Sequence, residues 1–124
     1  MKVVHLNTYE GNGGAGRACL RLNSALNAIG VDSSVMVYFQ FKESKLTRSF
    51  SRGPIQRARA VLNILSERYL SKAVAKAVKT PFSLGWFGTS VIDHPEVQSA
   101  DIIHLHWINH GFLSPKFLAE LDEL

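Results

Sequence analysis

The chain has very little cysteine and no long apolar run. Cys19 is the only cysteine, which excludes an intrachain disulfide and a zinc site built on several thiolates. No stretch approaches the ~20 apolar residues of a membrane span. The apolar run at residues 3–6 is too short for a signal-peptide core. We therefore expect a soluble protein of the reducing cytoplasm, at most peripheral at the inner face of the membrane.

Acidic residues are scarce between residues 42 and 79. This segment contains ten Lys or Arg and only two Glu, a net charge of +8, whereas the rest of the chain carries −4. Such asymmetry predicts a face that meets something anionic. A solvated helix face is the plainer alternative and an anionic membrane surface is another. Nucleic acid is disfavoured as a partner, because no known nucleic-acid-binding motif is present.

Apolar strand-like runs alternate with helical patterns along the 124 residues. Strands are expected at residues 3–7, 33–41 and 102–107, and helices at 17–29, at 55–78 and from 115 onward. This alternation predicts a Rossmann-like three-layer α/β/α fold with a mostly parallel sheet. Only three strands are clear, so we expect residues 1–124 to form part of a larger domain.

The helical patterns also predict which helix faces are buried. For residues 17–29 the expected apolar face is Ala18, Leu22, Ala25, Leu26 and Ile29. For residues 55–78 it is Ile55, Ala58, Leu62, Leu65, Tyr69, Ala73 and Ala77. Cys19 is expected to be a packing residue.

A glycine-rich stretch at residues 11–16 lies between the first strand and the first helix. Glycines let a ligand approach the backbone closely, and the following helix directs free N–H groups and its positive dipole end at that point. A diphosphate suits this environment, and Arg17 adds a positive charge there. The glycine spacing is not the dinucleotide fingerprint, so dinucleotide binding is disfavoured. The alternative is a tight strand-to-helix turn that binds nothing.

Three histidines accompany the last predicted strand. His104 and His106 share one face of that strand, while Trp107 lies on the other. Ligands of parallel sheets bind beyond the carboxyl ends of the strands, so we expect His106, Asn109 and His110 at a polar pocket rim. Packing against neighbouring helices is expected for His104. A metal site at His104, His106 and His110 is disfavoured, because no carboxylate or cysteine completes it at a recognised spacing.

Two stretches resemble the N-terminal domain of family 4-type (group 1), retaining glycosyltransferases of the GT-B fold. They are MKVVHLNTYEGNGGAGRACLRLNSALNAIGVDSSVMV, with its Gly-Gly-Ala-x-Arg loop, and ADIIHLHWINHGFLS, with its Asp-Ile-Ile-His-x-His-Trp strand. Together they cover about half of the chain. The resemblance implies two Rossmann-like domains facing a cleft, of which this chain is part of the N-terminal, acceptor-side one. The donor-binding domain and the next cleft motif would lie beyond Leu124, so this fragment alone is expected to be inactive.

By resemblance, the enzyme would transfer a sugar from a nucleotide-sugar donor to a polysaccharide or lipid-linked acceptor. The stretch Gly13, Gly14, Ala15, Gly16 and Arg17 would approach the donor diphosphate. The acceptor side would be lined by His106, Trp107, Asn109 and His110. The architecture implies no metal and no cofactor besides the nucleotide sugar as substrate. The rival interpretation is a non-catalytic α/β binding module for an anionic ligand, nucleic acid or membrane surface.

Overall fold

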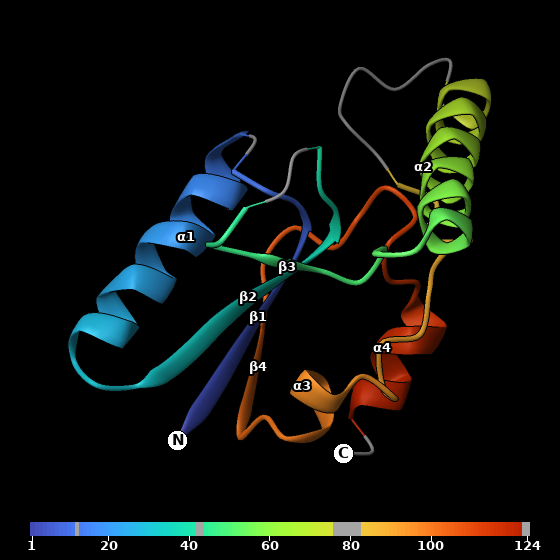
Figure 1. The fold of residues 1–124 in the computed structure, drawn as a ribbon. Coiled ribbons are helices and arrows are strands. Elements are labelled where there is room, and N and C mark those ends of the chain that lie inside the picture. Colours follow the sequence, from blue (N-terminus) through green and yellow to red (C-terminus); the bar gives the residue numbers. More distant parts are fainter. Residues whose placement is uncertain (12, 42–43, 76–82, 123–124) are drawn as a thin grey trace.

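The computed structural model describes residues 1–11, 13–41, 44–75 and 83–122. Its elements follow one another as β1 (Lys2–Tyr9), α1 (Gly13–Ala28), β2 (Asp32–Phe39), β3 (Arg48–Ser49), α2 (Pro54–Val74), α3 (Pro95–Gln98), β4 (Ile102–Leu105) and α4 (Pro115–Leu121). Helix α1 lies on one side of the sheet, whereas α2 and α4 lie on the other (Figure 1). None of the described helices is both long enough and apolar enough to cross a bilayer.

All the strand pairs of the sheet are parallel, in the order β3-β2-β1-β4. The α/β fold with a parallel sheet is therefore confirmed. Strand β1 is central, and it pairs Val3 with Ser33 on one side and with Ile102 on the other. Because the strands run in the same direction, the ends of β1, β2 and β4 reach one edge of the sheet together. Strand β3 was not predicted from the sequence. It has only two residues, and so short a strand shows no apolar periodicity.

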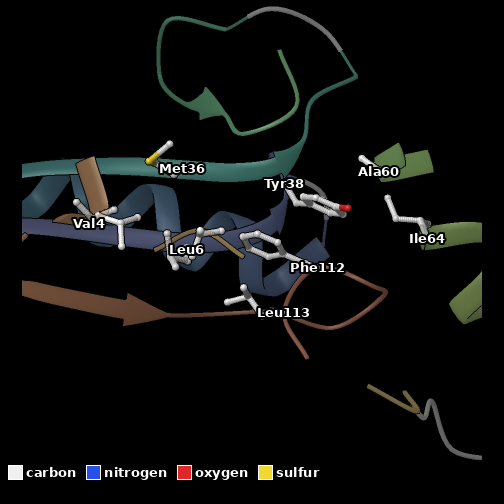
Figure 2. Packing of buried hydrophobic residues seen from close by; sticks show 10 residues of the cluster. Val4, Leu6, Met36, Tyr38, Ala60, Ile64, Phe112 and Leu113 are labelled. Atoms are coloured by element: carbon white, nitrogen blue, oxygen red, sulfur yellow. The ribbon is translucent and has the colours of Figure 1, made fainter. Parts of the chain in front are cut away.

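The main core lies between the sheet and the side that carries α2 and α4. Val4 and Leu6 of β1 and Met36 of β2 contribute to it from the strands. Tyr38 stacks on Phe112 with ring centroids 4.9 Å apart, and Ala60 and Ile64 of α2 approach the same place (Figure 2). The core therefore holds the loop after β4 against the end of β2.

Helix α1 begins earlier than the sequence predicts. Residues 17–29 were expected to be helical after a glycine loop, but α1 already starts at Gly13, so Gly13 to Gly16 form its first turn. The predicted buried face is also wrong, because Gly16 and Cys19 are the buried residues, while Ile29 is 75% exposed. Gly16 packs directly on the backbone of Gly11, and Cys19 packs against Val35 and Val37 of β2. The packing role of Cys19 is confirmed.

Helix α2 buries the face opposite to the one predicted. Its buried residues are Ala60, Ile64, Glu67 and Ser71. The described members of the predicted stripe lie on the exposed side, with Leu62, Leu65 and Tyr69 at 64%, 57% and 75% exposure. Periodicity locates the more apolar stripe, whereas the face that meets the core here contains Glu67 and Ser71 as well as Ala60 and Ile64. Residues 76–78 of the predicted helix, including Ala77, lie outside the described residues.

Candidate functional site

A pocket of about 260 Å³ lies where β1 and β4 end and α1 begins. It is lined by Asn7, Tyr9, Gly13, Gly14, Ala15, Gly16, Trp107 and His110. Two stretches that are far apart in the sequence therefore meet at one place, the carboxyl edge of the sheet. Open parallel sheets bind ligands at this edge, and a helix N-terminus there favours an anion.

The glycines of this pocket differ in what a side chain would meet. Gly13 has a φ of +77°, which only glycine adopts without strain. A Cβ at Gly16 would lie 3.0 Å from the backbone nitrogen of Gly11, so the first turn of α1 packs directly on the preceding loop. A Cβ at Gly14 would meet nothing within 4 Å. The absence of a side chain at Gly14 is therefore not required by packing within the chain, and it leaves space that a ligand could occupy.

Side chains at the end of β1 hold the loop that follows β4. Asn7 Oδ1 accepts a hydrogen bond of 3.0 Å from the backbone nitrogen of Trp107. Thr8 Oγ1 lies 2.7 Å from the carbonyl oxygen of Trp107 and 2.8 Å from that of Asn109. The sequence analysis did not single out Asn7 and Thr8, although two polar residues at the end of a buried apolar strand are a usable signal. These bonds position Trp107 at the pocket.

The predicted site residues separate into two groups. Residues 13–16, Trp107 and His110 line the pocket, whereas the side chains of Asn109 and Arg17 are exposed and do not. His110 adopts a φ of 61°, a left-handed conformation that costs a non-glycine residue energy and that occurs often at binding sites. Burial and the nearby Arg68 charge lower the pKa of His110, so its ring is neutral near pH 7.

His106 lies away from this pocket, in a cluster with His5 and Cys19 beneath α1. His5 Nδ1 lies 3.0 Å from His106 Nε2. His5 is fully buried and Cys19 is 1% exposed. One donor atom from each of these three residues lies within 4.8 Å of the others. Among the described residues, these three could therefore hold a metal ion. The set weighed from the sequence, His104, His106 and His110, has only His106 in common with this cluster.

The hydrogen bonds around His5 fix its tautomer. Ser33 Oγ donates to Asn23 Oδ1 over 2.8 Å, because a side-chain amide oxygen only accepts. Ser33 Oγ therefore accepts from His5 Nε2–H, which lies 3.1 Å away. The Nδ1 atom of His5 is left as an acceptor toward His106 Nε2–H. His104, expected to pack against neighbouring helices, is exposed instead and stacks on the ring of His106 at 4.2 Å.

The buried state of His5 makes the stability of the fold sensitive to acid. Burial, and then the charges of His106 and His104, lower the pKa of His5 from 6.5 to about 4. The unfolded chain takes up this proton below about pH 6.5, whereas the folded chain resists it until about pH 4. We expect the free energy of unfolding to be constant above this window and to fall as the pH drops through it. Urea unfolding at pH 7.5, 5.5 and 4.5 measures the loss.

The matched variants for this measurement are His5→Gln and His104→Gln. His5→Gln removes the buried titrating group, so its stability should depend much less on pH across the same window, whatever its absolute value. His104→Gln changes an exposed ring on β4, at the position paired with His5 of β1, and should keep most of the wild-type slope. An equal slope in His5→Gln and the wild type would contradict the assignment.

A second hollow, which we call the aromatic groove, adjoins the pocket lined by Gly13–Gly16, Trp107 and His110, which we call the glycine pocket. It has a volume of about 550 Å³ and is lined by Tyr9, Phe39, Phe41, Val61, Ile64, Leu65, Arg68 and His110. Tyr9 and His110 line both hollows, and Tyr9 Oη lies 3.3 Å from His110 Nδ1. The carboxyl edge of the sheet therefore presents a hollow formed by the first turn of α1 beside one formed by aromatic rings and aliphatic side chains.

Comparison of the chain with protein-family models, with curated proteins and with solved structures finds no match.

Proposed function

We propose that this chain is part of a glycosyltransferase that moves a sugar from a nucleotide-sugar donor to a glycan or lipid-linked acceptor. One observation carries the proposal. The N-terminal turn of α1, with Gly14 open to solvent, lines one pocket with Trp107 and His110 at the carboxyl edge of the sheet. The sequence resemblance to the acceptor-side domain of GT-B enzymes supports the same interpretation. The resemblance assigns residues 13–17 to the donor diphosphate and His106, Trp107, Asn109 and His110 to the acceptor side. Of these, residues 13–16, Trp107 and His110 line the pocket.

In this proposal the chain acts by positioning and by electrostatics. The free N–H groups and the dipole at the start of α1 stabilise the negative charge of the departing nucleoside diphosphate. Trp107 offers an aromatic face to a sugar ring, and the neutral ring of His110 offers hydrogen bonds to its hydroxyl groups. No described residue of the pocket is a carboxylate, and the proposal requires no metal.

The predicted membrane contact of residues 42–79 stays a prediction, and one observation favours it. The exposed apolar side of α2 is flanked by Arg57, Arg59, Arg68 and Lys72, all exposed, whereas the single acidic residue of this helix, Glu67, is buried. Exposed apolar side chains between cations suit an anionic bilayer surface. Contact with such a surface would bring the aromatic groove close to lipid-linked substrates.

An assay with a panel of nucleotide sugars tests the proposed transfer in the full-length protein. We expect one donor to be turned over, and Arg17→Ala to lower kcat/KM roughly tenfold if the guanidinium reaches the diphosphate on cleft closure. Arg21→Ala is the control, because Arg21 is also exposed and lies one turn further along the same helix. Equal effects of the two substitutions would remove Arg17 from the site, and no turnover of any donor would overturn the proposed function.

A further inference from the structure

A polar pocket of about 380 Å³ lies beyond the end of β2, where the chain passes through β3 into the first turn of α2. We call it the arginine pocket, because Arg48, Arg52 and Arg57 line it. The remaining lining consists of hydroxyl and amide side chains, namely Gln40, Ser44, Thr47, Ser49 and Ser51. No carboxylate is among the described lining residues, although Thr47 Oγ1 donates to Glu10 Oε1 over 2.8 Å. The remaining guanidinium and hydroxyl groups form a set of donors that fits phosphate oxygens.

Two of the three arginines have their charge available for a ligand. Arg48 pairs with Glu96, which also binds Lys2 Nζ at 2.8 Å. No ion pair of Arg52 or Arg57 with another described residue is present. Helix α2 starts beside them, and its N-cap Gly53 provides no side-chain hydrogen bond to the first turn. The guanidinium of Arg57 donates only to the carbonyl oxygen of Gln40, over 3.5 Å, which leaves its charge uncompensated by a described carboxylate. The positive end of this long helix therefore adds to the field of Arg52 and Arg57.

The arginine pocket and the aromatic groove meet at one contact. The guanidinium carbon of Arg57 lies 5.6 Å from the centroid of the Phe39 ring. Arg57 lines the arginine pocket and Phe39 lines the aromatic groove. The groove offers three aromatic rings and the aliphatic side chains of α2, with Arg68 and His110 as its polar members. A ligand that spans both hollows would therefore place an anionic group beside an apolar chain.

We propose that the arginine pocket and the aromatic groove together bind a phosphate or diphosphate ester of an apolar chain. The phosphate oxygens contact Arg52 and Arg57, and the apolar chain lies against Phe39 and Phe41. Such a ligand is an anionic lipid-linked acceptor, an assignment that rests on the proposed function. The groove continues through Tyr9 and His110 to the glycine pocket, so the acceptor would lie next to the donor diphosphate.

Calorimetric titration of the chain with geranyl diphosphate, pyrophosphate and geraniol tests both parts of this site. We expect geranyl diphosphate to bind roughly tenfold or more tightly than pyrophosphate, because the groove removes its chain from water. Geraniol should bind most weakly. Arg52→Gln and Arg57→Gln should each weaken geranyl diphosphate binding roughly tenfold. Phe41→Ala should abolish the advantage of geranyl diphosphate over pyrophosphate, and its 63% exposure makes it safe for folding.

Two exposed residues of α2 provide matched controls. Arg59→Gln removes the same charge two residues from Arg57, and Leu62→Ala removes an apolar side chain that lines neither hollow. Both should bind like the wild type. Equal losses in Arg57→Gln and Arg59→Gln would reveal a diffuse charge effect and overturn the site. Equal affinities for geranyl diphosphate and pyrophosphate would indicate that the site binds the phosphate groups alone. Binding to anionic vesicles but to neither diphosphate would indicate that it contacts a membrane surface. Either result would overturn the lipid-linked ligand.

These binding measurements are independent of turnover. Geranyl diphosphate binding without transfer from any nucleotide sugar would overturn the proposed function and leave the ligand class standing. Transfer to a soluble glycan acceptor without geranyl diphosphate binding would overturn the lipid-linked acceptor alone.

Discussion

Substituting Gly14 by alanine should reduce glycosyl transfer by on the order of a hundredfold, because displacing a reacting group by about 1 Å has an effect of this size. The added methyl group would meet no atom of the chain within 4 Å, so it enters the space where the donor diphosphate is proposed to lie. The fold should tolerate it, since alanine is a better helix residue than glycine by about 1 kcal/mol. Donor kinetics and urea unfolding of the same variant provide the measurement.

Gly16→Ala is the contrasting variant for this experiment. Its methyl group would lie about 3 Å from the backbone of Gly11, so the substitution should lower the free energy of unfolding as well as activity. A stable Gly14→Ala protein with wild-type kcat/KM would show that nothing approaches this turn closely. The α1 terminus would then be only a tight strand-to-helix connection.

Substituting Phe112 by alanine should cost about 3–5 kcal/mol of unfolding free energy, the range found for buried aromatic residues. Phe112 is fully buried, stacks on Tyr38 and lies 5.6 Å from the ring of Phe50. The cavity would open under the loop that carries Trp107 and His110, so ligand binding at the pocket should weaken together with stability. Urea unfolding measures this loss, which is a large part of the 5–15 kcal/mol typical of a whole domain.

Phe41→Ala is the matched control for stability, because the same side chain is removed from a position that is 63% exposed. Its unfolding free energy should change by less than about 0.5 kcal/mol. A loss below 1 kcal/mol in Phe112→Ala would mean that the core shown in Figure 2 is not what holds the loop after β4.

The parallel α/β fold could be predicted from the sequence because its strands and helices have distinct apolar periods. The pairing of β1 with β4 follows from topology rules, and it brings the glycine stretch to Trp107. The helix faces could not be predicted. In α1 the inner face consists of the small residues Gly16 and Cys19, which carry little hydrophobic signal. In α2 the buried face contains Glu67 and Ser71 beside Ala60 and Ile64, so the apolar pattern indicates the other face.

The candidate site was also predictable only in part, because sequence order locates strand ends but not which side chains meet in space. Trp107 and His110 lie near a strand end, which sequence order can locate. His106 lies on the other face of the sheet, where it contacts His5 and lies close to Cys19. That cluster combines one residue from β1, one from α1 and the residue that follows β4, separated by up to 101 positions. The arginine pocket was equally hidden, because the sequence shows its charges but not that Arg48, Arg52 and Arg57 converge on one hollow.

The order of the strands has a consequence for how the chain associates. Within the described residues, β4 has β1 on one side and no strand on the other, and Ile102 and Leu105 are 46% and 38% exposed. Its outer backbone groups form an open ladder that another segment can join by lateral strand addition. Whatever adds there would extend the sheet and shield these side chains from water. If nothing covers this edge strand, two chains can pair edge to edge through β4, and we expect such self-association at high concentration.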